Sequence, residues 1–273
     1  MLSKANDNIS GDGMEIDNMK ENNDAISSLS KALWKGYERH DFLYEGRATI
    51  VVLPKISAPG NPWVWRAEFF DAFPSVDMAL LERGWHLVYY KVSDMYGCPE
   101  AIKLMNGFHR FIIKLYVLNP KPVIFGFSRG GLYAFNYAAE YPREVSCLYL
   151  DAPVLDIRSW PGGKGAGQGS PKEWTDCMAI YGLTEDTARD FRGNPLDKVE
   201  VVAKAGVPII AVAGDADTAV PFLENSAILE KKYTEYGGNM KMIVKPGVGH
   251  HPHSLEDPRP IIDFILENAL LFL

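Results

Sequence analysis

One serine stands in a sequence pattern that is typical of an activated nucleophile. The run 123–127 is apolar and β-rich, it stops at Ser128, and a helix-like run begins at Gly130. This is the pattern G-x-S-x-G, in which a strand turns at once into a helix, and Gly126 and Gly130 leave room for the sharp turn. Such a turn exposes the hydroxyl at a helix N-terminus, where free backbone N–H groups stabilise developing negative charge. The pattern therefore predicts a serine nucleophile.

A serine hydroxyl needs a base to take its proton and an acid to orient that base, and candidates for both follow in the sequence. The acid candidate Asp217 comes shortly after the apolar run 207–213. The base candidate His250 comes after a third apolar run, 240–244. The predicted chemistry is acyl transfer: Ser128 attacks a carbonyl, His250 accepts and returns the proton, and Asp217 holds the imidazole tautomer.

At these residues the sequence resembles the α/β-hydrolase superfamily, and the resemblance covers nearly all of it from about Trp34 onward. The chain order Ser, Asp, His, each just beyond an apolar run, is the order of that superfamily. The pattern G-x-x-D-x-x-V-P over 214–221 marks Asp217 as the family's acid. The runs 60–70 and 249–255 are similar to a group of largely uncharacterised bacterial hydrolases, described as esterases or peptidase-like proteins.

The rest of the chain alternates between strand-like and helix-like runs. We expect strands at 37–43, 48–53, 86–92, 123–125, 146–150, 209–213 and 240–244, and helices at 75–83, 99–118, 222–236 and 261–271. Such alternation predicts a mainly parallel sheet covered on both faces, with function at the C-terminal ends of the strands. Together with the resemblance, it predicts an α/β-hydrolase fold with a doubly wound sheet of about eight strands.

Two segments depart from this alternation. Residues 1–30 are rich in Asn, Asp, Ser and Lys, and we expect a disordered polar tail because this composition cannot offset its own ordering entropy. The hydrolase domain would then span 31–273. Residues 155–195, which include the glycine-rich run 162–169, are expected to form a small cap of loops and helices that shapes the substrate pocket. A flexible surface loop is the alternative for this segment.

Two backbone N–H groups are expected to form an oxyanion hole. The residue after the nucleophile opens the helix, so the N–H of Arg129 is the first predicted donor. In relatives the second donor comes from the loop after the strand expected at 48–53, often as His-Gly followed later by Pro and Trp-Arg. Here Trp65-Arg66 are present while Ile56-Ser57 replace His-Gly, which points to the backbone of Ala58, or that of Ser57.

Two other acids compete for the role of the orienting carboxylate. Asp215 lies in the same loop as Asp217, and Asp151 ends the preceding strand-like run, where a minority of hydrolases place their acid. We favour Asp217 because of its register in the loop.

The substrate pocket is expected to contain aromatic and histidine side chains near the predicted strand ends. Tryptophans there could stack on a sugar or an aromatic ester, although tryptophans more often pack in a core. His251 and His253 are expected to line or brace the pocket. A metal site shared with His250 is the alternative, and we expect no metal because no second cluster of acids or cysteines accompanies these histidines. The predicted pocket residues are Ser57, Trp63, Tyr96, Trp160, His251 and His253, and the tryptophans considered for stacking are Trp63, Trp65, Trp160 and Trp174.

The bulk composition fits one α/β enzyme domain. The chain has 273 residues, 47% of them apolar, which is enough for a large core. A net charge of −7 with dispersed basic residues argues against a nucleic-acid partner. No apolar stretch reaches the roughly 18–20 residues that span a bilayer, and the first residues do not form a signal-peptide pattern. We therefore expect a soluble, cytoplasmic protein, with a removed export signal as the alternative.

Three cysteines are present without C-x-x-C spacing. Cys147 lies in an apolar run and is expected to pack as a small hydrophobe. The spacing leaves open whether Cys98 and Cys177 form a bridge.

Together these features predict a serine hydrolase that needs no cofactor, most simply a carboxylesterase acting on a small or carbohydrate-linked ester. A serine peptidase of the same fold is the nearest alternative. From another class, a hydrolase-like binding module without turnover is the second alternative; the missing His-Gly supports it and the complete set of Ser128, Asp217 and His250 speaks against it.

Overall fold

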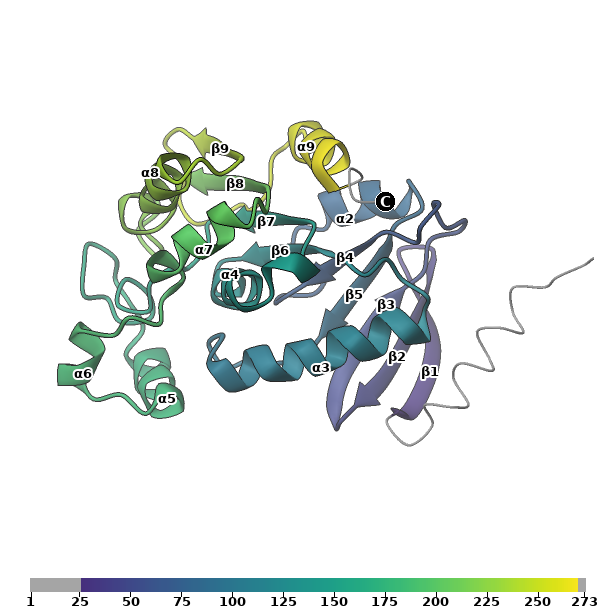
Figure 1. Cartoon of the computed structure of the whole chain (residues 1–273), viewed down its shortest axis with the longest axis horizontal. Helices are drawn as coiled ribbons and strands as arrows, with labels where there is room; N and C mark the ends of the chain where they lie inside the picture. Colours follow the sequence, from purple (N-terminus) through teal and green to yellow (C-terminus); the bar gives the residue numbers. More distant parts are fainter. Residues whose placement is uncertain (1–25, 270–273) are drawn as a thin grey trace, which may run out of the picture.

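A computed structural model describes residues 26–269 of the chain, with side chains from residue 29 onward, so the predicted tail over 1–25 lies outside the described residues. Within 26–269, nine strands form one sheet in the order β1-β2-β3-β5-β4-β6-β7-β8-β9 (Figure 1). The strands are β1 (Ile26–Trp34), β2 (Tyr37–Tyr44), β3 (Arg47–Val52), β4 (Trp63–Arg66), β5 (His86–Tyr90), β6 (Val123–Phe127), β7 (Cys147–Asp151), β8 (Ile209–Gly214) and β9 (Met240–Lys245).

Two tight hairpins build the antiparallel side of the sheet. Lys35-Gly36 joins β1 to β2, and Glu45-Gly46 joins β2 to β3, with positive φ at all four residues. Two-residue turns of this kind match the right-handed twist of the flanking strands. β3 pairs antiparallel with β5, and from β5 through β4 and β6 to β9 every neighbouring pair is parallel.

The structure corrects the sequence predictions at two strands. β1 begins at Ile26, so the last five residues of the predicted tail belong to an edge strand. Main-chain hydrogen bonds to β2 form there whatever the side-chain polarity, which composition alone does not register. The other unpredicted strand is β4, which has only four residues, all buried, and therefore shows neither alternation nor length. The sheet accordingly has nine strands within the described residues, not about eight.

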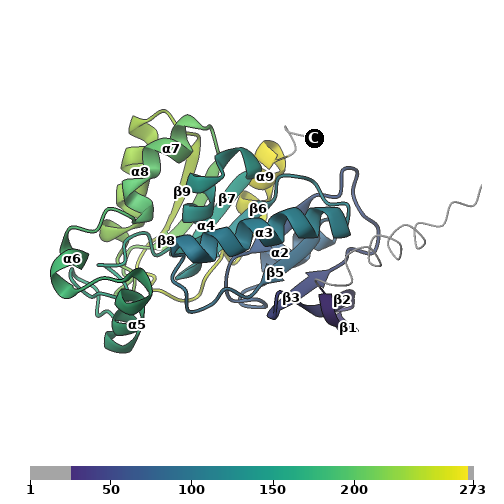
Figure 2. The same ribbon diagram turned by 60° about the horizontal axis from the view of Figure 1, so that its bottom comes forward.

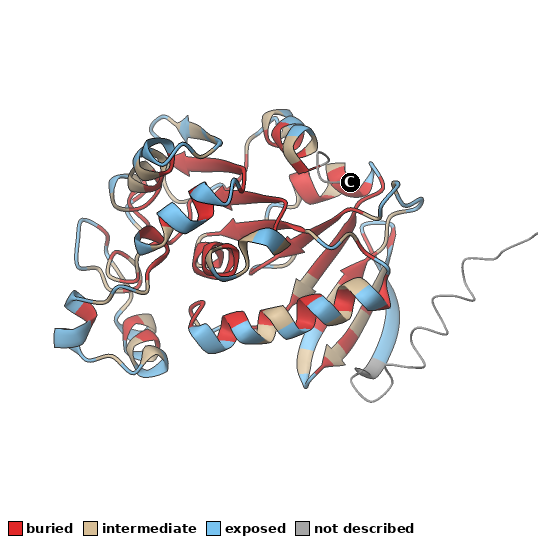
Figure 3. Cartoon of the chain, in the orientation of Figure 1, coloured by how far each residue is buried: buried red, intermediate tan, exposed pale blue. Residues whose placement is uncertain are grey.

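Helices cover both faces of the sheet (Figures 1 and 2). One face carries α3 (Pro99–Leu115), α4 (Gly130–Glu140), α7 (Val199–Lys204) and α8 (Ser226–Glu235), and the other carries α2 (Ser75–Leu81) and α9 (Arg259–Ala269). Successive residues of β7 alternate between the two cores: Leu148 packs on the first face and Tyr149 on the second. The central strands are buried throughout (Figure 3), which explains why their sequences are continuous apolar runs.

Residues 155–195, the expected cap, extend beyond one end of the sheet (Figure 2). They contain α5 (Pro171–Tyr181) and α6 (Glu185–Arg189), followed by the short 3-10 turn η2 (Pro195–Asp197). The Tyr181 hydroxyl donates a hydrogen bond to the Tyr96 carbonyl, 2.8 Å away, and the Gln168 N–H donates to the Thr218 carbonyl at 3.2 Å. These bonds attach the segment to the loops after β5 and β8.

Cys98, Cys147 and Cys177 are buried and free, so Cys98 and Cys177 do not form a bridge. Burial raises the pKa of the Cys147 thiol, as expected for a cysteine that packs as a hydrophobe. Among the helices of residues 26–269, none combines the length and the apolarity needed to cross a membrane.

The close packing of α4 against the loop after β7 leads to a test. A Cβ added at Gly131 would lie 2.6 Å from the Pro153 Cβ and 2.8 Å from the Val154 carbonyl oxygen. We expect Gly131→Ala to lower the free energy of unfolding by about 1–3 kcal/mol, measured by urea denaturation. The matched control is Gly107→Ala in α3, where the nearest atom would be the Tyr44 hydroxyl at 4.0 Å, and where alanine stabilises a helix by up to about 1 kcal/mol. Equal effects of the two substitutions would contradict the expected clash.

Candidate active site

Ser128 occupies the sharp turn between β6 and α4. Its φ is 49°, a left-handed conformation that is unusual for a residue with a side chain. The turn leaves no space at Gly126, where a Cβ would lie 2.8 Å from the Ala134 Cβ. The Ser128 N–H donates a hydrogen bond to the Asp151 carbonyl at the end of β7, 2.9 Å away. The strained turn is thus held by the neighbouring strand, and it presents the hydroxyl at the start of α4.

The structure brings Ser128, His250 and Asp217 together in one hydrogen-bonded chain. The Ser128 Oγ lies 2.9 Å from the His250 Nε2, and the His250 Nδ1 lies 2.7 Å from the Asp217 Oδ2. The three residues follow the C-terminal ends of β6, β8 and β9, which are neighbouring parallel strands apart from β7 between the first two. With Nδ1–H directed at the carboxylate, Nε2 is free to accept the serine proton.

Backbone hydrogen bonds hold the Asp217 carboxylate in its charged form. Burial by itself would raise the pKa of Asp217, but the hydrogen bond from His250 and those from the N–H groups of Val220 and Ala219 outweigh it, so the pKa lies below its usual value. The two N–H groups reach the Asp217 Oδ1 at 2.8 Å from Ala219 and 2.9 Å from Val220. A fixed, ionised carboxylate is what orienting and stabilising an imidazolium requires.

The two competing acids have other partners. Asp215 accepts a hydrogen bond from the Gly247 N–H at 2.6 Å and so joins the loops after β8 and β9. Asp151 is fully buried and accepts from the His253 Nδ1 at 2.8 Å, from the Ser254 N–H at 2.7 Å and from the Tyr149 hydroxyl at 2.6 Å. Neither carboxylate contacts His250.

The structure contradicts the prediction that the backbone of Ala58, or that of Ser57, supplies the second oxyanion donor. The Ala58 N–H donates to the Gly84 carbonyl at 2.9 Å, and the Ser57 Oγ lies 3.4 Å from the His86 Nε2. Gly84 and His86 precede or begin β5, so Ser57 and Ala58 lie at the edge of the sheet opposite to Ser128. The wrong prediction arose because β4 was not recognised: the loop that faces the nucleophile follows β4, not the strand over 48–53.

Phe69, in the loop after β4, is the residue that sequence reasoning missed. It lines the same cavity as Ser128, its φ is 54°, and among the described residues its N–H has no hydrogen-bond acceptor. The Arg129 N–H, the predicted first donor, likewise has no acceptor in that part of the chain. The two amides therefore belong to the two segments from which this kind of site takes its oxyanion donors. The sequence could have indicated Phe69 only if Trp65-Arg66 had been identified as the end of a strand.

The Arg129 side chain connects three segments around the nucleophile. Its guanidinium lies 3.2 Å from the Glu68 Oε2, 3.2 Å from the Glu173 Oε2 of α5 and 3.1 Å from the Asp94 Oδ1. Burial raises the pKa of Glu68, an effect that Arg129 opposes. The Tyr96 hydroxyl also donates to Glu173. Residues on both sides of the expected cap boundary thus share one ionic network.

A cavity of about 330 Å³ lies beside Ser128. Its wall is largely apolar and aromatic, and none of its described lining residues is acidic. Of the predicted pocket residues, it contains Trp160, His251 and His253. His251 is exposed, and partial burial together with the neighbouring His253 and His250 lowers its pKa. The apolar lining residues include Phe69, Phe73, Phe127, Trp160 and Val220.

Three predicted pocket residues lie elsewhere. Ser57 is at the opposite edge of the sheet, as described above. Trp63 begins β4, is completely buried, and stacks on Trp65 with ring centroids 5.7 Å apart, so both belong to the core. Tyr96 is buried and does not line this cavity, although its ring centroid lies 6.5 Å from that of Trp160. Trp174 is buried, and its Nε1–H donates a hydrogen bond to Glu185. Of the four tryptophans considered for stacking, Trp160 alone lines the cavity.

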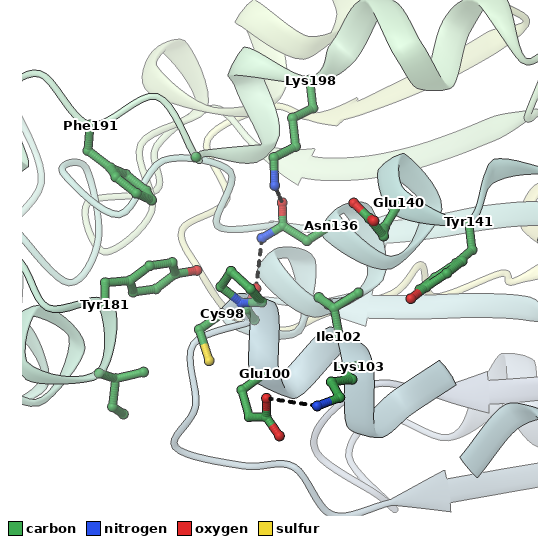
Figure 4. A pocket seen from close by; sticks show the side chains of 14 residues that line it. Cys98, Glu100, Ile102, Lys103, Asn136, Glu140, Tyr141, Tyr181, Phe191 and Lys198 are labelled. Atoms are coloured by element: carbon green, nitrogen blue, oxygen red, sulfur yellow. Dashed lines mark hydrogen bonds and ion pairs between the residues drawn. The ribbon is translucent and has the colours of Figure 1, made fainter. Parts of the chain in front are cut away.

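A larger cavity, of about 650 Å³, contains none of the three hydrogen-bonded residues (Figure 4). It opens between the start of α3, α4 and the segment around Tyr181 and Phe191. At its wall the Lys198 Nζ donates to the Asn136 Oδ1 at 2.9 Å, and the Asn136 amide donates to the Gly97 carbonyl at 3.0 Å (Figure 4). The smaller cavity is therefore the candidate active site, because it holds the groups with reactive geometry.

Comparisons with known proteins agree with this architecture. A family model described as alpha/beta hydrolase fold matches residues 104–184. A search of curated proteins gave no match.

Three solved structures illustrate the likeness. Dipeptidyl peptidase 4 from Porphyromonas gingivalis aligns with a TM-score of 0.64 and 13% identity over 88% of this chain, which spans only 35% of that protein. Est1E from Butyrivibrio proteoclasticus aligns with a TM-score of 0.59 and 18% identity over 88% of this chain and 98% of its own. A puromycin-hydrolyzing peptidase from Mycobacterium tuberculosis aligns with a TM-score of 0.61 and 12% identity, covering 87% of this chain and 37% of the peptidase.

The order of the sheet, the family model and these likenesses together show that the chain has the α/β-hydrolase fold.

The ionic network at Arg129 gives a second test. Arg129→Met leaves the Glu68 carboxylate, 2% exposed, without its cation, and we expect the free energy of unfolding to fall by about 3–5 kcal/mol. The double variant with Glu68→Gln removes the buried, unpaired charge at position 68, so part of this loss should be recovered in urea denaturation. Losses that simply add would show that the two side chains are not energetically coupled.

Proposed function

We propose that this protein is a serine hydrolase that acts through an acyl-enzyme on Ser128. The observation that carries the proposal is the continuous chain of hydrogen bonds from the Ser128 Oγ through His250 to Asp217, at 2.9 Å and 2.7 Å. These distances lie within the reach that proton transfer between a nucleophile and its base requires.

The residues would act in two steps. In the first, the Ser128 oxygen attacks the substrate carbonyl while His250 takes the serine proton, and then returns it to the leaving alcohol as the C–O bond breaks. In the second, His250 takes a proton from water, whose oxygen attacks the acyl group, and Ser128 is released with its proton restored. The N–H groups of Arg129 and Phe69 are the proposed donors to the oxyanion, and no cofactor takes part.

The cavity supports a carboxylesterase that acts on small esters. Its aromatic and aliphatic wall suits an apolar acyl group, and Trp160 offers one face for stacking. For a carbohydrate-linked ester, the alternative, the hydroxyl groups of the sugar would have to find their hydrogen-bond partners outside this apolar wall. The likeness to Est1E, which extends over 98% of that protein, is consistent with an esterase.

A serine peptidase is the second candidate, favoured by the likeness to two peptidases. The lining of the cavity supports a peptidase less well than it supports an esterase. A peptide with a free N-terminus brings a cation, and no acidic residue is among the described residues that line the wall. A binding module without turnover is the third candidate, and the intact hydrogen-bonded chain from serine to acid speaks against it.

Covalent labelling tests the proposal directly. A fluorophosphonate probe should add to the wild-type protein in a one-to-one ratio, measured by intact mass, and Ser128→Ala should not be labelled. Folded wild-type protein that stays unlabelled would remove the case for an activated serine.

A matched pair of aspartate variants tests the acid. We expect Asp217→Asn to lower kcat by about 10⁴-fold on an activated ester, because it stabilises the wrong imidazole tautomer. Asp215→Asn alters an exposed carboxylate two residues away that bonds Gly247, and it should change kcat little. A large loss in both variants would point to a disturbed loop, and a large loss in Asp215→Asn alone would assign the role to the other acid.

The oxyanion donors can be located in the labelled protein. A crystal structure of the phosphonylated enzyme should place one phosphonyl oxygen about 2.7–3.1 Å from the backbone nitrogens of both Arg129 and Phe69. An oxygen bound to Arg129 and to a different second donor would exclude Phe69.

A further inference from the structure

Three histidines form a compact group at the mouth of the cavity. The ring centroids of His250, His251 and His253 lie 4.8–5.0 Å apart in every pair. One ring nitrogen from each lies within 4.8 Å of a ring nitrogen of the other two. From the sequence, a metal site at these histidines was only an alternative, because no second cluster of acids or cysteines accompanies them along the chain. The folded protein supplies those acids from other strands.

Two of the three imidazoles are each held by a buried carboxylate. The Asp217 Oδ2 lies 2.7 Å from the His250 Nδ1, and the Asp151 Oδ1 lies 2.8 Å from the His253 Nδ1. In metal sites, a ligating histidine donates its other N–H to a carboxylate in this way, which fixes the ring and makes it more basic. In both residues the nitrogen left for a metal is Nε2, and both rings line the cavity.

The third imidazole is free to adjust. His251 is exposed, makes no hydrogen bond within the described part of the chain, and stacks on Phe73 with ring centroids 5.7 Å apart. Around a tetrahedral Zn²⁺ with bonds of about 2.0–2.1 Å, ligand nitrogens lie about 3.3 Å from one another. The three nitrogens, which lie within 4.8 Å of one another, must therefore move closer together. The exposed His251 ring can do so by rotation, whereas His250 and His253 must tilt about their hydrogen bonds to Asp217 and Asp151.

We propose that Zn²⁺ binds to His250, His251 and His253 and reversibly inhibits the protein. Three neutral imidazoles are a donor set that suits Zn²⁺, and water or the Ser128 hydroxyl would take the fourth position. The bond to zinc uses the Nε2 lone pair of His250, which otherwise accepts the hydrogen bond from Ser128. The metal-bound protein can then no longer take the serine proton. This inhibitory effect rests on the proposed function, whereas metal binding does not.

The first experiment tests Zn²⁺ binding in a variant without the Ser128 hydroxyl, so that the result does not depend on catalytic activity. Isothermal titration of the metal-free Ser128→Ala protein with Zn²⁺ should give one site per chain, and Co²⁺ should give the intense visible absorption of tetrahedral coordination. His251→Ala and His253→Ala should each weaken Zn²⁺ binding at least 10-fold. Asp151→Asn, which loosens the His253 ring, should weaken it by about 10–100-fold.

The matched control is His86→Gln, which alters a histidine at the opposite edge of the sheet and should leave Zn²⁺ affinity unchanged. Unfolding by urea shows which variants are folded, and the exposed His251→Ala variant keeps the test decisive if a buried variant is not. Absence of Zn²⁺ binding, octahedral Co²⁺ spectra, or affinity that His251→Ala does not change would overturn the proposal.

The inhibition is tested separately on the wild-type protein. Fluorophosphonate labelling of Ser128 should be slowed by Zn²⁺ at least 10-fold and restored by a chelator. Labelling that proceeds at the same rate with zinc bound would overturn the inhibitory role. Absence of labelling even without zinc would contradict the proposed function and leave the result of the binding titration standing.

Discussion

The sharp turn at Ser128 is the constraint on which the rest of the site depends. A residue with a side chain is held at a φ of 49°, a conformation that is unfavourable unless its surroundings enforce it. Two contacts enforce it here. α4 packs so tightly on β6 that Gly126 has no room for a side chain, and the Ser128 N–H donates a hydrogen bond to the last residue of β7. The turn determines both where the hydroxyl lies and where the first N–H groups of α4 point.

Parallel strand order then brings the other groups to the same edge. Residues after β4, β6, β7, β8 and β9 meet there, although they are separated by up to about 180 positions in sequence. Because each loop starts from a strand whose register is fixed by its neighbours, its first residues have little freedom. This explains how His250 and Asp217 reach Ser128 at hydrogen-bond distance, and why Asp151 and His253 form a second pair directly beside them.

Two polar side chains, the buried Asp151 and the largely buried Arg129, hold together the loops that shape the pocket. Asp151 accepts three hydrogen bonds, two of them from His253 and Ser254 in the loop after β9. Arg129 joins Glu68 in the loop after β4 to Glu173 of α5. Both groups are costly to bury unless every partner is present. Their networks therefore couple the position of the nucleophile to the position of the segment that carries Trp160.

The sequence by itself determined the fold class and the three residues of the hydrogen-bonded chain. Ser128, Asp217 and His250 could be identified because each follows a recognisable strand-like run, and the pattern around Ser128 and Asp217 is typical of the family. Only the tertiary structure decided which residues surround them. β4 is too short and too evenly buried to show a period, so the loop after it was missed and Ser57 and Ala58 were chosen instead of Phe69. Trp63 and Trp160 are the same residue type, yet one lies in the core and the other in the pocket. The carboxylates behind His250 and His253 come from different strands. Which side chains share a cavity depends on contacts between segments distant in the chain, and composition and spacing do not encode these contacts locally.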